Sequence, residues 1–241
     1  MELKIYKDYE QLSANAANEI ADLLKQKPGA VICLASGDTP KLTYQLFAEK
    51  IINENIDISN CTFIGLDEWV GIPPENEGSC QYFFRKYLFE PLQVTPGQTY
   101  LFNALSSSLE EECKKMDETI LAKGGIDLMM VGIGMNGHIG FNEPGVSFDL
   151  YSHIINLDET TVTVGQKYFN SQTVLQKGIT LGLKHFVESK KAIVLANAAK
   201  KAGIIKKALE DEISNHVPAT IIRTHAQGVV MIDEEAASLL K

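Results

Sequence analysis

The chain has 241 residues, of which 45% are hydrophobic and 22% charged, and its formal net charge is −9. These values are those of a globular protein with a full core, and the acidic balance argues against a nucleic-acid-binding surface. No apolar run approaches the ~20 residues that span a bilayer, and the first residues lack the apolar core of a signal peptide. Four cysteines without a CxxC pair favour reduced thiols. We therefore expect a cytoplasmic protein without membrane attachment.

Continuous apolar runs of strand length recur along the chain and are typical of strands buried on both faces of a parallel sheet. They cover residues 30–35, 61–66, 126–133, 192–196 and 228–233. Helix candidates with apolar residues near helical spacing alternate with them, at residues 8–26, 40–53, 79–90, 108–122, 172–188 and 199–210. This order predicts a single Rossmann-like α/β domain over residues 1–241. Its sheet should be doubly wound and mostly parallel, with helices on both faces. Ligands of such folds bind beyond the carboxyl ends of the strands.

The first loop of interest follows the strand at 30–35 and reads Ser36-Gly37-Asp38-Thr39. Pro40 suits the first position of a helix, which predicts Thr39 as its N-cap. Free backbone N–H groups and the helix dipole make such a turn a natural anion site, although no Walker pattern is present. An ordinary strand-to-helix turn is the alternative. A phosphate there requires Asp38 to point away from it.

The second loop places Asp67 and Glu68 at the end of the strand at 61–66. Because side chains alternate along a strand, only one of the two carboxylates should face the cleft. No histidine or further acid follows at a ligand-like spacing, so a metal site is not favoured. A catalytic base and a solvated strand end both remain open at this point.

The third loop, residues 132–145, reads "GIGMNGHIGFNEPG". Its first six letters match a dinucleotide-binding fingerprint, but the glycines and Pro144 that follow rule out the helix which that fingerprint requires. Histidine is the usual proton shuttle near neutral pH, and Glu143, held extended before Pro144, can orient the imidazole of His138. A buried structural histidine is the alternative. The two residues together in one loop at a strand's carboxyl end favour a catalytic role.

The motifs "SGDTP", "LDEWVGIP" and "GIGMNGHIGFNEPG", in this order and spacing, resemble the glucosamine-6-phosphate deaminase (isomerase) family over nearly the whole chain. The related 6-phosphogluconolactonases typically carry Ser-Leu-Phe-Pro-Gly where this chain has Phe-Asn-Glu-Pro-Gly at residues 141–145. The resemblance therefore implies a deaminase, which converts glucosamine 6-phosphate and water to fructose 6-phosphate and ammonia. It implies no metal and no organic cofactor.

The resemblance also implies roles for individual residues. Asp67 would be the base that moves a proton between C2 and C1 of the sugar. His138 would open the pyranose ring, and Glu143 would support it. Asn136 stands where many family members have an aspartate in this His–carboxylate group, which leaves charge stabilisation of the imidazolium to Glu143.

The same resemblance assigns the phosphate end of the site. Ser36, Gly37 and Thr39 would cradle the phosphate, and Lys201 would bind it. A lid around residues 150–176 would supply Lys167 where the family usually has an arginine. The basic residues of the family's allosteric activator site are missing around residues 151–153, so no such activation is expected.

Three other functions are weighed against this one. A galactosamine-6-phosphate deaminase would give tagatose 6-phosphate, since the differences in the lid and turn bear on the C4 epimer. A 6-phosphogluconolactonase would use His138 to activate water and would need no base at C2. A non-catalytic sugar-phosphate sensor would bind the ligand without turnover. In each case the expected partner is a small sugar phosphate rather than nucleic acid or a membrane, and the sequence allows a homo-oligomer.

Overall fold

The computed structural model describes residues 1–241 as ten strands and eight α-helices, joined by turns that include short 3₁₀ and π segments. The strands are β1 (Glu2–Tyr6), β2 (Val31–Leu34), β3 (Thr62–Gly65), β4 (Asp67–Trp69), β5 (Thr99–Tyr100), β6 (Leu128–Gly132), β7 (His153–Asn156), β8 (Lys177–Thr180), β9 (Lys191–Ala196) and β10 (Gly228–Asp233). The helices are α1 (Tyr9–Gln26), α2 (Asp38–Asn53), α3 (Cys80–Phe84), α4 (Leu109–Ala122), α5 (Glu159–Gly165), α6 (Leu183–Glu188), α7 (Ala202–Glu210) and α8 (Glu234–Ala237). None of these helices is long and apolar enough to cross a bilayer.

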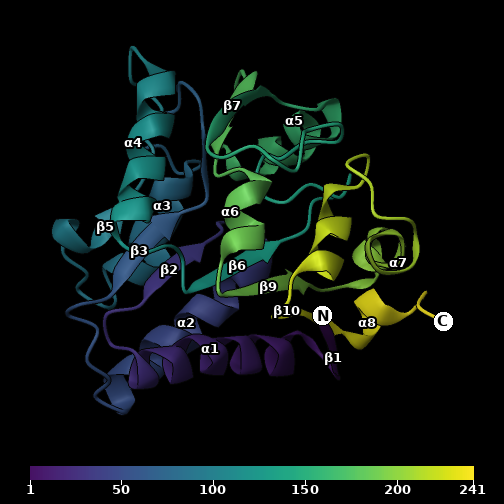
Figure 1. Cartoon of the computed structure of the whole chain (residues 1–241), viewed down its shortest axis with the longest axis horizontal. Coiled ribbons are helices and arrows are strands. Elements are labelled where there is room, and N and C mark those ends of the chain that lie inside the picture. Colours follow the sequence, from purple (N-terminus) through teal and green to yellow (C-terminus); the bar gives the residue numbers. More distant parts are fainter.

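The central sheet has seven strands in the order β1-β10-β9-β6-β2-β3-β5, and every pairing in it is parallel (Figure 1). This confirms the predicted doubly wound α/β fold. The order changes direction next to β2, so the loops after β2 and β6 leave the sheet side by side. Such a switch point is where ligands bind in open α/β sheets.

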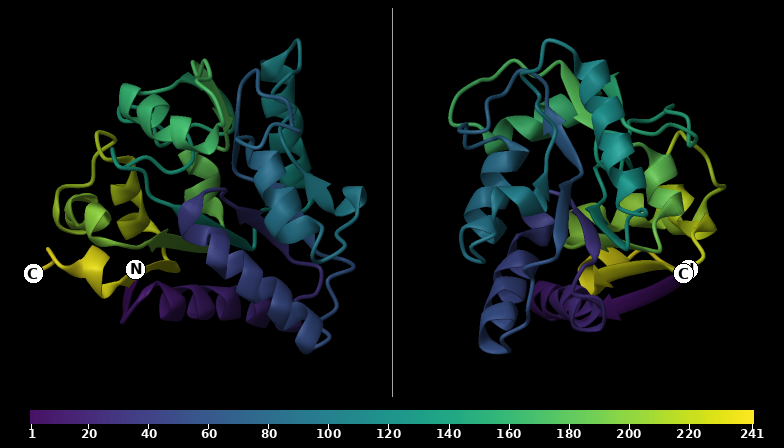
Figure 2. Two further views of the ribbon diagram at one scale, coloured as in Figure 1. Left: turned by 180° about the vertical axis from the view of Figure 1, so that it is seen from behind. Right: turned by 60° about the vertical axis from the view of Figure 1, so that its left-hand side comes forward.

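Residues of one strand alternate between two apolar cores, one on each face of the central sheet. In β2, Cys33 belongs to one core, whereas Ile32 and Leu34 belong to the other. Helices α1 and α2 bury their apolar sides in the core of Ile32, and α4, α6 and α7 cover the opposite face. The two further views show these two helical layers (Figure 2). Burial on both faces explains why these strands are continuous apolar runs.

A second, three-stranded antiparallel sheet has the order β4-β8-β7. It contains β8, which corrects the predicted helix at 172–188: residues 177–180 are a strand, and only 183–188 are helical. At Gly178 a Cβ atom would lie 2.4 Å from the ring of Phe141, and at Gly182 it would lie 2.0 Å from the carbonyl oxygen of Leu150. The strand is specified by its pairing with β4 and β7, which are far from it in sequence and therefore leave no mark on the local periodicity.

Candidate active site

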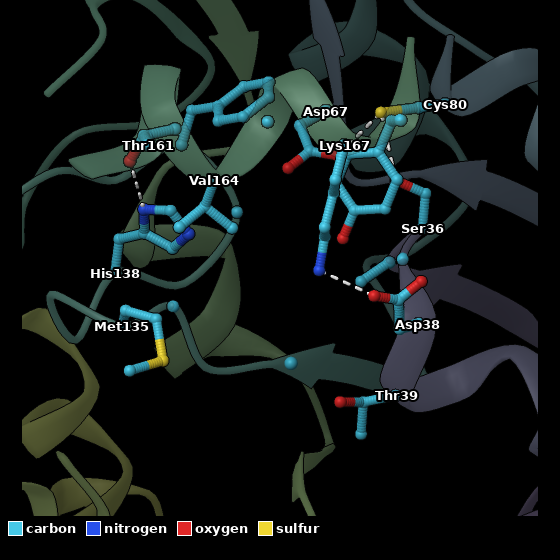
Figure 3. A pocket seen from close by; sticks show the side chains of 18 of the residues that line it. Ser36, Asp38, Thr39, Asp67, Cys80, Met135, His138, Thr161, Val164 and Lys167 are labelled. Atoms are coloured by element: carbon cyan, nitrogen blue, oxygen red, sulfur yellow. Dashed lines mark hydrogen bonds and ion pairs between the residues drawn. The ribbon is translucent and has the colours of Figure 1, made fainter. Parts of the chain in front are cut away.

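The loops after β2, β3, β6 and β9 meet around a cavity of about 630 Å³. Eight of the nine residues singled out in the sequence line it: Ser36, Gly37, Thr39, Asp67, Asn136, His138, Lys167 and Lys201. The ninth, Glu143, lies behind His138 and is 4% exposed. Figure 3 shows Asp67 and His138 on different walls of this cavity, with Asp38 and Thr39 on a third side. Segments separated by more than 100 residues in sequence thus form one site.

The two adjacent carboxylates that begin β4, just after β3, have separate environments, as strand alternation predicts. Asp67 lines the cavity, whereas Glu68 is 1% exposed and points into the protein. Glu68 accepts hydrogen bonds from the backbone N–H groups of Trp69, Cys80 and Gln81 and from the hydroxyl of Ser79. Glu68 is therefore a structural carboxylate that fixes the start of α3, and Asp67 is the one available for chemistry.

Asp67 has the properties of a base that works near neutral pH. Burial, followed by the charge of neighbouring Glu68, raises the pKa of Asp67 to about 7. A hydrogen bond from the thiol of Cys80 acts in the opposite direction. A carboxyl with such a pKa is partly ionised at pH 7, and its conjugate acid is weak enough to return the proton.

His138, Glu143 and Asn136 form one hydrogen-bonded group. Nδ1 of His138 lies 3.1 Å from Oε2 of Glu143 and 3.1 Å from the hydroxyl oxygen of Thr161. Asn136 donates to the same Oε2 at 2.8 Å, and its side-chain oxygen accepts from the backbone N–H of His138 at 3.2 Å. Because Nδ1 faces the carboxylate, Nε2 is the nitrogen left for a ligand in the cavity.

Glu143 supplies the negative charge of this hydrogen-bonded group. Burial raises the pKa of Glu143, but the hydrogen bond and charge of His138, with Thr161 and Asn136, outweigh that effect, so the pKa lies below its ordinary value. Glu143 is therefore ionised at neutral pH and can stabilise a protonated imidazole. Asn136 lends a neutral hydrogen bond, which is consistent with the division of roles expected from the sequence.

The imidazole of His138 lies so close to the backbone at position 134 that only glycine fits there. A Cβ atom there would lie 2.3 Å from both Cδ2 and Nε2 of His138, and the N–H of Gly134 donates to the carbonyl oxygen of His138 at 2.9 Å. The backbone after β6 thus turns back and packs directly against the ring. No helix follows between residues 133 and 152, so the helix that a dinucleotide fingerprint requires is absent, as the sequence predicts.

The loop between β2 and α2 differs from the prediction in one respect. Helix α2 starts at Asp38 with Gly37 as its N-cap, so the predicted N-cap role of Thr39 is wrong. Gly37 has a φ of +117°, a conformation that favours glycine, and the helix therefore starts two residues earlier than predicted. The hydroxyl of Thr39 donates instead to the side-chain oxygen of Asn197 at 2.8 Å. The N-terminal backbone of a 16-residue helix still opens onto the cavity.

Three lysines gather at this end of the cavity: Lys167, Lys200 and Lys201. Nζ of Lys201 donates to the carbonyl oxygen of Ile133. Burial, and then the charges of Lys200 and Lys167, lower the pKa of Lys201 to about 8. Nζ of Lys167 is paired with Asp38 at 2.6 Å. A chain of net charge −9 thus focuses positive charge where an anion would bind.

Several side chains of the site were not identified from the sequence. Asn197 follows β9 directly, in a segment that the carboxyl-end rule already indicates, and Thr161 lies in the "LDETT" segment that shares in the family resemblance. Tyr168 places its hydroxyl over Gly37. Cys80 reaches the site from the start of α3 and had no local signal, because only the pairing of Glu68 with that helix brings it near Asp67.

Comparison with known proteins gives one consistent family. A family model described as "Glucosamine-6-phosphate isomerases/6-phosphogluconolactonase" matches residues 7–231. A glucosamine-6-phosphate deaminase of Clostridium perfringens is 37% identical over 242 residues, which cover 100% of both chains. A second one, from Thermoanaerobacter pseudethanolicus, is 37% identical over 241 residues, which cover 100% of this chain and 95% of the relative.

Solved structures agree with the sequence matches. One, described as a monomeric glucosamine-6-phosphate deaminase of the NagB superfamily, superposes with a TM-score of 0.96 at 36% identity over 99% of this chain and 100% of its own. The 6-phosphogluconolactonase of Trypanosoma brucei superposes with a TM-score of 0.81 at 18% identity, over 100% of this chain and 98% of its own. At that identity the second match shows the fold alone.

Proposed function

The chain belongs to the glucosamine-6-phosphate isomerase/6-phosphogluconolactonase family, and from this premise we propose that it is a glucosamine-6-phosphate deaminase. The reaction converts glucosamine 6-phosphate and water to fructose 6-phosphate and ammonia. The observation that carries the proposal is the single cavity in which Asp67 and the His138–Glu143 pair face one ligand space, with a group of lysines at its phosphate end.

Ring opening is the step assigned to His138. Nε2 accepts the proton of the anomeric hydroxyl, and the imidazolium returns a proton to the ring oxygen, which breaks the bond from C1 to that oxygen. The ionised Glu143 beside Nδ1 stabilises the imidazolium. The product is the open aldehyde with its amine still on C2.

Isomerisation is the step assigned to Asp67. Its carboxylate removes the proton from C2 while a proton of the substrate ammonium group moves to the aldehyde oxygen, which gives an enolamine, and Asp67 then delivers its proton to C1. C2 becomes an iminium carbon, water adds to it, and ammonia leaves to give the ketose phosphate. The pKa of Asp67, raised to about 7, supports both the removal and the return of the proton.

Phosphate binding is assigned to the loop of Ser36, Gly37 and Thr39 with Lys201 and Lys167. The start of α2 offers backbone N–H groups and the positive end of its dipole, and the lysines add charge. The segment around residues 150–176 carries Lys167 and contains β7 and α5. We assign it the role of a lid over the substrate, within one domain of residues 1–241.

Two further properties belong to this proposal. All four cysteines are free and buried thiols, which fits an enzyme of a reducing compartment, the cytoplasm.

The homo-oligomer that the sequence allows stays a prediction, because one relative of solved structure is described as monomeric. Light scattering of the purified protein decides between a monomer and an oligomer.

The test of the function is release of ammonia from glucosamine 6-phosphate and from galactosamine 6-phosphate, measured side by side with the ketose phosphate. The proposal expects equal amounts of ammonia and fructose 6-phosphate, and a higher kcat/KM for the glucosamine substrate. Preference for the galactosamine substrate would select the other epimer. Hydrolysis of 6-phosphogluconolactone without ammonia release from either sugar would select the lactonase, and binding of both sugars without turnover would select the sensor.

A further inference from the structure

Cys80 is the only cysteine that lines the cavity. It is 3% exposed, and its Sγ lies 3.6 Å from Oδ1 of Asp67, within the range of a sulfur hydrogen bond. On its other side the hydroxyl of Ser36 donates to Sγ at 3.1 Å. Figure 3 shows the sulfur of Cys80 connected by dashed lines to Asp67 on one side and Ser36 on the other.

The ionised carboxylate of Asp67 can only accept a hydrogen bond, so the thiol of Cys80 must be the donor to it. The hydroxyl proton of Ser36 points at sulfur, so the S–H of Cys80 is free to point at the carboxylate. Burial raises the pKa of the Cys80 thiol well above its ordinary value, which keeps the proton on sulfur. Cys80 is therefore a neutral donor to Asp67 and not a nucleophile.

No other side chain or backbone group donates to the carboxylate of Asp67 in the structure, so Oδ2 is left for the substrate. The sulfur is itself held in place, since Glu68 accepts hydrogen bonds from the backbone N–H groups of Cys80 and Gln81, both at 3.0 Å. A base must be oriented within a fraction of an ångström of its proton, and a single fixed donor can do this.

We propose that Cys80 is a positioning residue for Asp67: its thiol holds Oδ1, turns Oδ2 toward C2 of the sugar, and connects the base through Ser36 to the loop that binds phosphate. This inference rests on the proposed deaminase function. It makes Cys80 a determinant of the proton-transfer step that acts through Asp67.

The experiment measures kcat and KM for ammonia release from glucosamine 6-phosphate across pH for the wild type, Cys80→Ala and Cys80→Ser. Cys61→Ala is the matched control, because it removes a buried thiol of the same size at the start of β3, away from the cavity. Thermal unfolding of each variant reports on folding.

Loss of the donor in Cys80→Ala disfavours the ionised carboxylate, so the acid limb of kcat/KM should move to higher pH by about 0.5–1 unit. At the acid end kcat should fall by about 3- to 10-fold, with KM changed less than about twofold. Cys80→Ser keeps a donor and should recover most of the shift. Cys61→Ala should leave the limb where it is in the wild type.

An unmoved acid limb in folded Cys80→Ala overturns the inference, as does a KM increase that accounts for the whole loss. Equal losses of kcat in Cys80→Ala and Cys61→Ala, with the acid limb of kcat/KM unchanged in both, also overturn the inference, because they show a packing role only. A wild type that releases no ammonia contradicts the proposed function instead, so the two failures are distinct.

Discussion

Asp67 is the residue on which the proposed chemistry depends most, and its environment sets a pH dependence. Its pKa is raised from 3.8 to about 7, chiefly by burial and then by Glu68. As a base it works only when ionised, so kcat/KM should rise with pH and reach half of its plateau near pH 7. A pH profile of ammonia release checks this, and full activity at pH 5 would contradict it.

The raised pKa of Asp67 has a consequence for stability that is independent of activity. A carboxyl whose folded-state pKa lies above its unfolded value contributes stability below the unfolded value and loses it as pH rises through the folded value, here between 3.8 and about 7. Asp67→Asn removes this titration. The melting temperature of Asp67→Asn minus that of the wild type should therefore be larger at pH 8 than at pH 4, because only the wild type loses this stabilisation as pH rises.

Glu143 is expected to act through His138 and not at C2. Glu143→Gln keeps a hydrogen-bond partner for Nδ1 but removes the charge that stabilises the imidazolium, so kcat should fall by about 10²-fold. Ring opening then limits the rate, and the isotope effect with substrate deuterated at C2 should fall toward one. An isotope effect larger than that of the wild type would instead connect Glu143 to the C2 step.

Lys201 makes phosphate binding sensitive to alkaline pH. Its pKa is lowered to about 8, so the side chain is charged below that pH and neutral above it. Affinity for inorganic phosphate as a competitive inhibitor should fall as pH rises through about 8. In Lys201→Met this dependence should disappear together with most of the affinity. Lys207→Met, at an exposed position of α7 outside the cavity, is the control, and the same pH dependence in Lys201→Met would refute the assignment.

The segment that we propose as a lid is linked to the phosphate loop by one ion pair. The 3₁₀ turn Gln166–Tyr168 after α5 is tied to the phosphate loop by the pair of Lys167 with Asp38, at 2.6 Å. Both side chains are largely exposed, so the pair stabilises the contact between this turn and the phosphate loop by less than about 1 kcal/mol. A phosphate that enters must compete with Asp38 for Lys167.

This competition predicts opposite effects of two substitutions. Asp38→Asn removes a carboxylate that repels phosphate and occupies Lys167, and KM should fall by about threefold. Lys167→Met removes a cation from the lid, and KM should rise by about tenfold with kcat changed less than twofold. Steady-state kinetics of both variants check this. Changes of KM in the same direction would contradict the competition.

The elements that the sequence predicted well are those with local causes. The central strands are apolar because both faces are buried, and α1, α2, α4 and α7 begin near caps or apolar stripes that are visible in the chain. The strand Lys177–Thr180 was predicted as part of a helix, because its pairing with Asp67–Trp69 and His153–Asn156 connects segments far apart in sequence. Short strands of this kind depend on tertiary contacts.

The site shows the same division. Asp67 and His138 could be selected as candidates because they follow strands whose carboxyl ends share one edge of the sheet, whereas the roles of Asp67 and Lys201 came from the family resemblance. The N-cap role of Thr39 was wrong because Gly37 adopts a φ of +117° and starts α2 early. Cys80 could not be identified, since the contact of its helix with Glu68 is a property of the folded chain.

Taken together, the chain assembles a neutral-pH base, a histidine with its carboxylate and a lysine-rich anion site from four loops of one parallel sheet. An acidic protein of net charge −9 can offer a site for the proposed phosphorylated sugar because three lysines concentrate positive charge at one end of the cavity. The family fold supplies the edge of the sheet, and the residues in the loops decide the reaction.

The most direct test of this account is the amount of ammonia formed from glucosamine 6-phosphate by the wild type and by Asp67→Asn at pH 8. Asp67 is mostly ionised at that pH. We predict one ammonia per fructose 6-phosphate for the wild type, and a kcat reduced by at least about 10³-fold in a folded Asp67→Asn that still binds the substrate. Full turnover by Asp67→Asn, or a wild type that forms no ammonia, would contradict the account.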